Sequence, residues 1–148
     1  SIGRGVLLTE IQQTSDITYR VFDWNRKDDQ GKHRELHTGL ALEAIDYKKY
    51  DQYKKHPEIK KNKTSEIQKC DYFIVSRLLF DTLTQKDYQD IKSFVIYICT
   101  EGHFSLMDEY DHKIIEIKKG ETVLIPAILK RFYLKPYEVS ELLEVYIP

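Results

Sequence analysis

Short runs of β-branched and aromatic residues, separated by turn residues, recur along most of this sequence and constrain its fold more than any other feature. Eleven Tyr and six Phe accompany many Ile and Val, and such side chains favour pleated, half-buried strands. Turn residues near Thr14, Asp108 and Gly120 separate several of these runs. The predicted strands are 5–12, 17–24, 71–81, 93–100, 103–107, 113–117, 122–125, 131–134 and 141–147. The regular spacing predicts a mainly β fold, a sandwich or a small barrel.

The pattern changes between residues 27 and 65. The polar, turn-rich run RKDDQGKHR leads into ELHTGLALEAIDYKKY, where Leu36, Leu40 and Ala44 recur at helical spacing. We expect one short helix there. The Lys-rich segment 48–63 contains few apolar residues and is typical of an exposed connector.

The charge balance argues against two classes of partner. Lys and Arg number 23 against 24 for Asp and Glu, which gives a net charge of −1 and no overall attraction to nucleic acid or anionic membrane. No apolar run approaches the roughly 20 residues of a membrane span. Cys70 and Cys99 lie far apart without CxxC spacing, which favours two reduced thiols in a soluble, cytoplasmic protein.

The Lys-rich segment also allows an RNA-binding interpretation. Tyr47, Tyr50 and Tyr53 interleave with its lysines, and aromatic and basic side chains together bind single-stranded nucleic acid. The balanced overall charge and the lack of a nucleic-acid motif favour a solvated connector, without a nucleic-acid partner.

A polar turn near the start of the chain brings two opposite charges together. If Thr14, Ser15 and Asp16 form a hairpin turn, Glu10 and Arg20 become direct cross-strand neighbours. By geometry alone this pair is either a surface ion pair worth less than about 1 kcal/mol or part of a substrate pocket.

Three stretches carry a family resemblance. GVLLTEIQQTSDITYRVFDWNR resembles the segment that follows the last zinc ligand in type I mannose-6-phosphate isomerases, particularly their short bacterial branch. ELHTGLALEAID resembles the next helix of that family, and KKGETVLIPA resembles a strand and turn near its carboxyl end. The three stretches follow the family's order and span nearly the whole chain.

The resemblance implies the carboxyl-terminal part of a two-cupin, zinc-dependent enzyme that interconverts mannose 6-phosphate and fructose 6-phosphate. Residues 1–26 would be terminal strands of the catalytic cupin, 27–65 a helical and charged connector, and 66–148 a smaller cupin-like jelly roll. In this second cupin the expected metal-binding His is replaced by Arg131 in PAILKR. The resemblance therefore implies that it holds no metal.

The resemblance also implies roles for a few residues. Glu10 matches the family's active-site glutamate and Arg20 the arginine near the reacting sugar, while Arg26 falls near a basic residue of some relatives. The zinc ligands have no counterpart among the five His of this sequence and are expected upstream of Ser1. We therefore expect these 148 residues alone to be a fragment, free of zinc and inactive.

One alternative of another class stays open. The chain would then be a non-enzymatic, cupin-like sugar-binding or interaction module. A His directly upstream of Ser1, preceded by Gln-x-His and a Glu, would indicate the enzyme.

Overall fold

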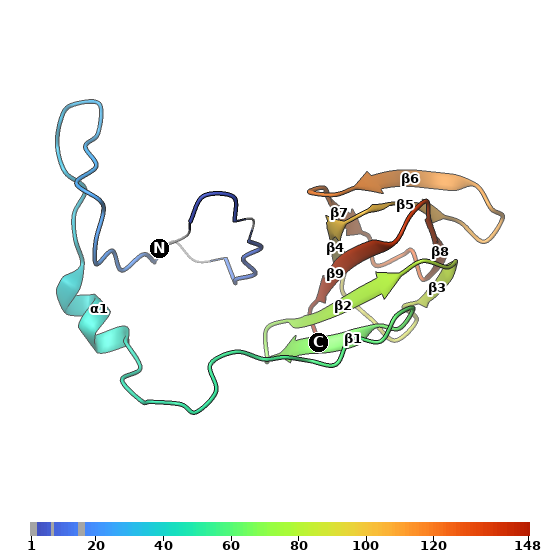
Figure 1. The fold of residues 1–148 in the computed structure, drawn as a ribbon, viewed down its shortest axis with the longest axis horizontal. Helices are drawn as coiled ribbons and strands as arrows, with labels where there is room; N and C mark the ends of the chain where they lie inside the picture. The colour runs from blue at the N-terminus through green and yellow to red at the C-terminus, as the bar shows by residue number, and fades with distance from the viewer. Residues whose placement is uncertain (1–2, 7, 15–16) are drawn as a thin grey trace. The chain divides into compact units, whose positions relative to one another are not determined.

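The computed structural model describes residues 3–6, 8–14 and 17–148. The chain divides into two compact units, Ser1–Tyr53 and Lys54–Pro148, which are described separately. Within the described residues of the first unit, the regular secondary structure is the single helix α1, Thr38–Ala44 (Figure 1). This confirms the helix predicted from the spacing of Leu36, Leu40 and Ala44. No helix in the described ranges is long and apolar enough to cross a membrane.

The second unit is built from antiparallel strands (Figure 1). Their bounds are β1 Ser65–Lys69, β2 Ile74–Phe80, β3 Thr84–Asp87, β4 Val95–Glu101, β5 His103–Met107, β6 Lys113–Lys118, β7 Thr122–Ile125, β8 Arg131–Pro136 and β9 Ser140–Tyr146. They form a five-stranded sheet in the order β1-β2-β9-β4-β7 and a four-stranded sheet in the order β3-β8-β5-β6. The mainly β prediction is confirmed. Two short strands, β1 and β3, were not predicted.

The two strands predicted at 5–12 and 17–24 are not formed by the described residues of these ranges. Ser15 and Asp16, in the predicted turn, lie outside the described residues. The side chains of Val6, Ile17 and Val21 are more than half exposed. A two-stranded hairpin is only marginally stable without packing against a further layer, and the described residues of the first unit form no sheet that could provide one.

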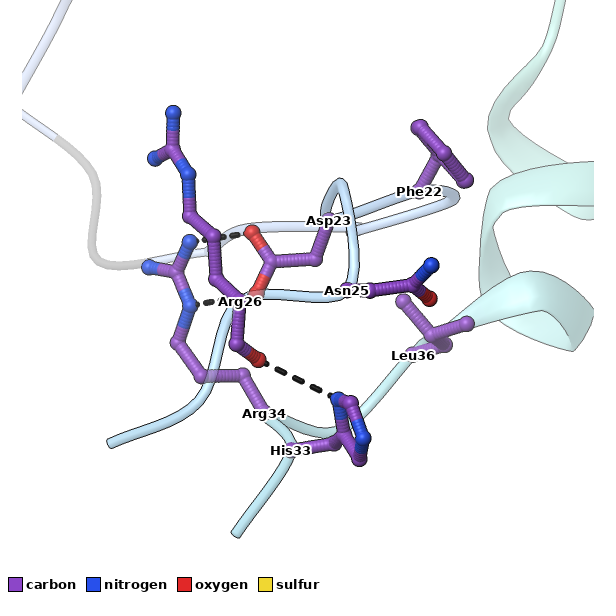
Figure 2. A pocket seen from close by; sticks show the side chains of 7 residues that line it. All are labelled: Phe22, Asp23, Asn25, Arg26, His33, Arg34 and Leu36. Atoms are coloured by element: carbon purple, nitrogen blue, oxygen red, sulfur yellow. Dashed lines mark hydrogen bonds and ion pairs between the residues drawn. The ribbon is translucent and has the colours of Figure 1, made fainter. Parts of the chain in front are cut away.

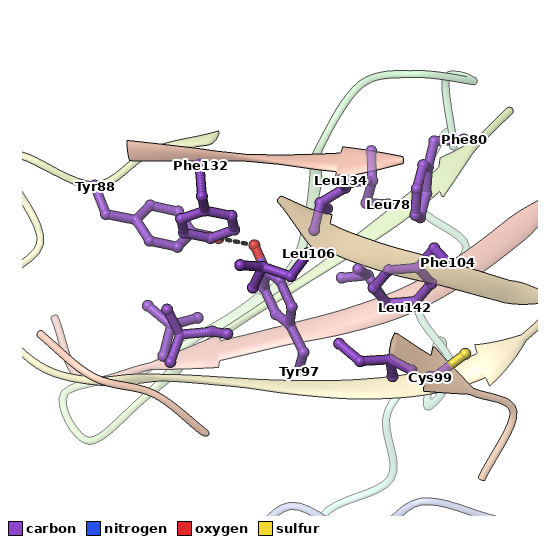
Figure 3. Packing of buried hydrophobic residues seen from close by; sticks show 13 residues of the cluster. Leu78, Phe80, Tyr88, Tyr97, Cys99, Phe104, Leu106, Phe132, Leu134 and Leu142 are labelled. Atoms are coloured by element: carbon purple, nitrogen blue, oxygen red, sulfur yellow. Dashed lines mark hydrogen bonds between the residues drawn. The ribbon is translucent and has the colours of Figure 1, made fainter. Parts of the chain in front are cut away.

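Alternating side chains of the two sheets meet in one core. Along β4, Val95, Tyr97 and Cys99 are buried, whereas the residues between them are partly exposed, as strand geometry requires. Figure 3 shows this interior, in which aromatic and aliphatic side chains interdigitate. The cluster contains Leu78, Phe80, Tyr88, Val95, Tyr97, Cys99, Phe104, Leu106, Ile117, Ile125, Phe132, Leu134 and Leu142. Both cysteines are free, and burial raises the pKa of the Cys99 thiol to about 11.

A buried polar network crosses this core. The Lys86 ammonium lies 2.5 Å from Glu144 Oε2, and the Tyr88 hydroxyl donates to the same oxygen at 2.5 Å. The Tyr97 hydroxyl contacts that of Tyr88 (Figure 3). Burial, reinforced by the Glu144 charge, raises the pKa of both tyrosines, so both hydroxyls keep their protons. Because Tyr88 donates to Glu144, Tyr97 donates to Tyr88.

Gly102 provides a close approach between β5 and β9. Its φ is +79°, and an added Cβ would lie 2.5 Å from both Ser140 Oγ and the Val139 carbonyl oxygen. Ser140 is fully buried and accepts a hydrogen bond from His103 N at 3.0 Å, so it has no room to withdraw.

We expect Gly102→Ala to lower the free energy of unfolding by about 3 kcal/mol, through both backbone strain and the clash. Gly120→Ala is the matched control, because Gly120 has φ +87° but nothing within 4 Å of an added Cβ. The control should lose only about 1 kcal/mol from the left-handed conformation. Urea denaturation measures the free energy of unfolding of both variants. Equal losses in the two variants would contradict the predicted clash at Gly102.

Candidate active site

A loop in the first unit, residues 20–37, closes on itself through its two end residues. The backbone N–H of Arg20 donates to His37 Nδ1 at 3.2 Å, and the backbone N–H of His37 donates to the Arg20 carbonyl oxygen at 2.7 Å. The Arg20 guanidinium donates from Nη1 to the Glu35 carbonyl oxygen at 3.1 Å. We call residues 20–37 the arginine loop, because Arg26 and Arg34 also belong to it.

An ion pair spans the middle of the arginine loop. Arg34 binds the Asp23 carboxylate with two donors, Nε at 2.7 Å and Nη2, as Figure 2 shows. This bidentate geometry matches the planar guanidinium fork to the carboxylate. Donation from Arg34 lowers the pKa of Asp23; desolvation opposes this shift, while the positive charges of Arg34, Arg20 and Arg26 add to it. Asp23 is therefore an anion held among three arginines.

The turn of the arginine loop carries unusual backbone angles. Trp24 and Asn25 have φ of 52° and 55°. Asn visits this left-handed region readily, but a bulky residue such as Trp seldom does. The Trp24 ring packs edge to face on Phe22, with centroids 5.1 Å apart. Strained backbone of this kind concentrates at binding and catalytic sites.

A cavity of about 230 Å³ lies beside this turn. It is lined by Phe22, Asp23, Asn25, Arg26, His33, Arg34 and Leu36 (Figure 2). His33 Nδ1 lies 3.2 Å from the Arg26 carbonyl oxygen, and Lys27 pairs with His33 in an isolated β-bridge. The apolar walls of the cavity, Phe22 and Leu36, adjoin charged residues of both signs. The Asp23 carboxylate lines the cavity together with Arg26 and Arg34.

The structure does not bring the two predicted site residues together. Glu10 is exposed, and Arg20 is partly buried at the base of the arginine loop. Among residues 3–6, 8–14 and 17–148, no ion pair joins Glu10 to Arg20, so the predicted cross-strand pairing is not formed there. The catalytic roles of both residues stay predictions. Sequence reasoning missed Asp23 and Arg34, whose eleven-residue separation follows no short motif.

The described residues provide few side chains that could bind a metal ion together. Within the part of the chain that the structure describes, no group of three or more His, Cys, Asp or Glu side chains is arranged to hold a metal ion. His33 and His37 each direct Nδ1 at a main-chain atom of the arginine loop. These residues alone do not fit a zinc site.

The two antiparallel sheets of the second unit enclose one core, which defines the class of this domain as a β-sandwich. Residues 62–140 match the family model described as mannose-6-phosphate isomerase, cupin domain. The chain belongs to this family, which confirms the cupin-like fold and the family resemblance.

Several relatives of this chain are named as mannose-6-phosphate isomerases, in agreement with the family match. The chain is 33% identical over 140 residues to mannose-6-phosphate isomerase ManA of Bacillus subtilis, covering 93% of this chain and 43% of ManA. It is 34% identical over 134 residues to the putative mannose-6-phosphate isomerase YvyI of the same organism, covering 89% of this chain and 41% of YvyI. The crystal structure of a B. subtilis mannose 6-phosphate isomerase superposes with a TM-score of 0.70 at 28% identity, covering 90% of this chain and 41% of that one. The chain thus spans less than half the length of these relatives.

Proposed function

We propose that these 148 residues are the carboxyl-terminal part of a mannose-6-phosphate isomerase that interconverts mannose 6-phosphate and fructose 6-phosphate. The family match and the named relatives support this assignment. The observation that carries the site proposal is the anchoring of the Arg20 backbone. Its N–H donates to the His37 side chain at Nδ1, and its carbonyl oxygen accepts from the His37 N–H. The Arg20 guanidinium donates from Nη1 to the Glu35 carbonyl oxygen. Among the described residues, the other donors of this guanidinium make no hydrogen bond.

Such an anchored guanidinium suits the reaction. Aldose to ketose isomerisation moves a proton between C2 and C1 and develops negative charge on oxygen. Arg20 would orient the sugar oxygens and stabilise that charge with its remaining donors. Glu10 would act as the acid/base group that accepts a proton.

The proposal includes zinc in the complete enzyme. Its ligands would come from outside these residues, as the family resemblance implies, and zinc would supply Lewis acidity at the sugar oxygens. We expect the isolated 148-residue chain to be inactive, and this chain to be free of zinc.

The test is a coupled assay of the full-length protein with mannose 6-phosphate. We expect a chelator to abolish activity and Arg20→Ala to lower kcat/KM about 100-fold, which corresponds to the loss of about 2.7 kcal/mol of transition-state stabilisation. Arg131→Ala is the control, because Arg131 is exposed and pairs with Asp87 on the second unit.

The outcomes separate the alternatives. An unchanged rate for Arg20→Ala would remove the role assigned to that residue. Zinc-dependent activity of the isolated chain would refute the placement of the ligands. A full-length protein that binds sugar phosphates without converting them would be a binding module.

A further inference from the structure

The side chain of His37 does not perform the usual role of a residue at the start of a helix. It is the N-cap residue of α1, yet its side chain makes no capping hydrogen bond. Its carbonyl oxygen accepts the first helical bond, from Ala41 N at 2.9 Å. The helix therefore fixes the His37 backbone, and the imidazole ring remains free to make a contact outside the helix.

That contact is the Arg20 main chain. Nδ1 accepts the Arg20 N–H at 3.2 Å, and the His37 N–H returns a bond to the Arg20 carbonyl oxygen at 2.7 Å. Because Nδ1 accepts, the ring is neutral and carries its proton on Nε2. We call these two reciprocal bonds the His37 clasp. Both peptide groups of Arg20 are thereby tied to the start of one helix.

The arginine loop supports the clasp from its other side. The Asp23 and Arg34 side chains join through two hydrogen bonds, and Glu35, directly after Arg34, accepts from the Arg20 guanidinium. Backbone and guanidinium of Arg20 are thus set by residues 35 and 37. A displacement of about 1 Å in a positioned catalytic group can cost roughly 100-fold in rate.

We propose that His37 is a positioning residue for the reaction, acting through the His37 clasp to hold Arg20 in its working geometry. This inference rests on the proposed function and deepens it. In this role His37 acts through Arg20 and not on the substrate directly. If Arg20 acts on charge that develops in the transition state, a loosened clasp lowers kcat and leaves KM nearly unchanged.

The test compares His37→Ala with His37→Asn in the full-length enzyme. The alanine variant loses the acceptor, and we expect kcat to fall 10- to 100-fold with KM within about twofold. The Asn side-chain oxygen can occupy the place of Nδ1, so His37→Asn should recover most of the rate. Glu43→Ala is the control, because Glu43 is an exposed residue of the same helix.

A direct readout of the clasp is amide hydrogen exchange at Arg20. His37→Ala should speed exchange of the Arg20 N–H, and His37→Asn should restore its protection, with circular dichroism and thermal melting confirming that each variant is folded. A wild-type kcat in a folded His37→Ala variant, or a His37→Asn rate as low as that of alanine, would overturn the inference. An unchanged Arg20→Ala rate would instead refute the role proposed for Arg20. A full-length protein without isomerase activity would refute the proposed function, and both results differ from a failure of the His37 clasp alone.

Discussion

Lys86→Ala is expected to lower the free energy of unfolding of the cupin domain by about 3–5 kcal/mol, because it leaves the Glu144 carboxylate buried without its cation. The side chains of Lys86 and Glu144 are only 7% and 5% exposed, and their charged atoms lie 2.5 Å apart. Once Lys86 is removed, the Tyr88 hydroxyl remains as the side-chain donor to Glu144. One neutral donor does not replace the solvation of a carboxylate.

Urea denaturation of the variant measures this loss, and two controls sharpen it. Lys119→Ala removes the cation of an ion pair with Glu101 whose side chains are 53% and 63% exposed, so it should cost no more than about 1 kcal/mol. The double variant Lys86→Met with Glu144→Leu removes both charges and should be more stable than Lys86→Ala. A Lys86→Ala loss no larger than that of Lys119→Ala would contradict the prediction.

Phe132→Ala is expected to cost about 3–5 kcal/mol, since it removes a fully buried ring from the centre of the sandwich. Phe132 is 0% exposed, and its ring centroid lies 5.4 Å from that of Tyr88 and 6.2 Å from that of Tyr97. Because Phe132 belongs to β8 and Tyr97 to β4, the contact joins the two sheets. The cavity left behind would also loosen the packing of Tyr88 and Tyr97, the pair whose hydroxyls are linked to Glu144.

Thermal and urea unfolding measure this effect. Ile128→Ala is the matched control, because Ile128 is also a large apolar residue but is 88% exposed, and its loss should stay within about 0.5 kcal/mol. Equal stability of the two variants would show that the interior can collapse around the missing ring. That result would contradict the tight packing described for the core.

The sequence pattern located most strands correctly, and its failures have a physical cause. β2 and β4 to β9 each overlap a predicted strand, because their runs are rich in β-branched, aromatic and other apolar residues and are bounded by turn residues. β1 and β3 read SEIQK and TQKD, with too few β-branched, aromatic or other apolar residues to be predicted as strands. They lie at one end of each sheet, where pairing with a neighbour, rather than burial on both sides, holds a strand.

Sequence reasoning reached the candidate site only in part. Arg20 and Glu10 were identified through the family resemblance, because residue spacing alone left open whether they form a surface ion pair or line a substrate pocket. The contacts of Arg20 with His37 and of Asp23 with Arg34 bring together residues 17 and 11 positions apart. They depend on how the polar run between them folds back, which no periodicity encodes.

The sequence by itself determined the strand-rich class, the short helix at 38–44 and the family, because strand-favouring runs, helical spacing and local motifs are properties of neighbouring residues. The tertiary structure decided which charges are buried and which residues hold the site. From the sequence, Lys86 and Glu144 are expected at the surface, whereas in the structure β3 and β9 place both side chains in the interior, where they form an ion pair. In the sequence His37 is only a residue at the start of a helix, whereas in the structure its ring accepts a hydrogen bond from the Arg20 N–H. Both outcomes require contacts between distant segments, and the free energy of those contacts exists only in the folded chain.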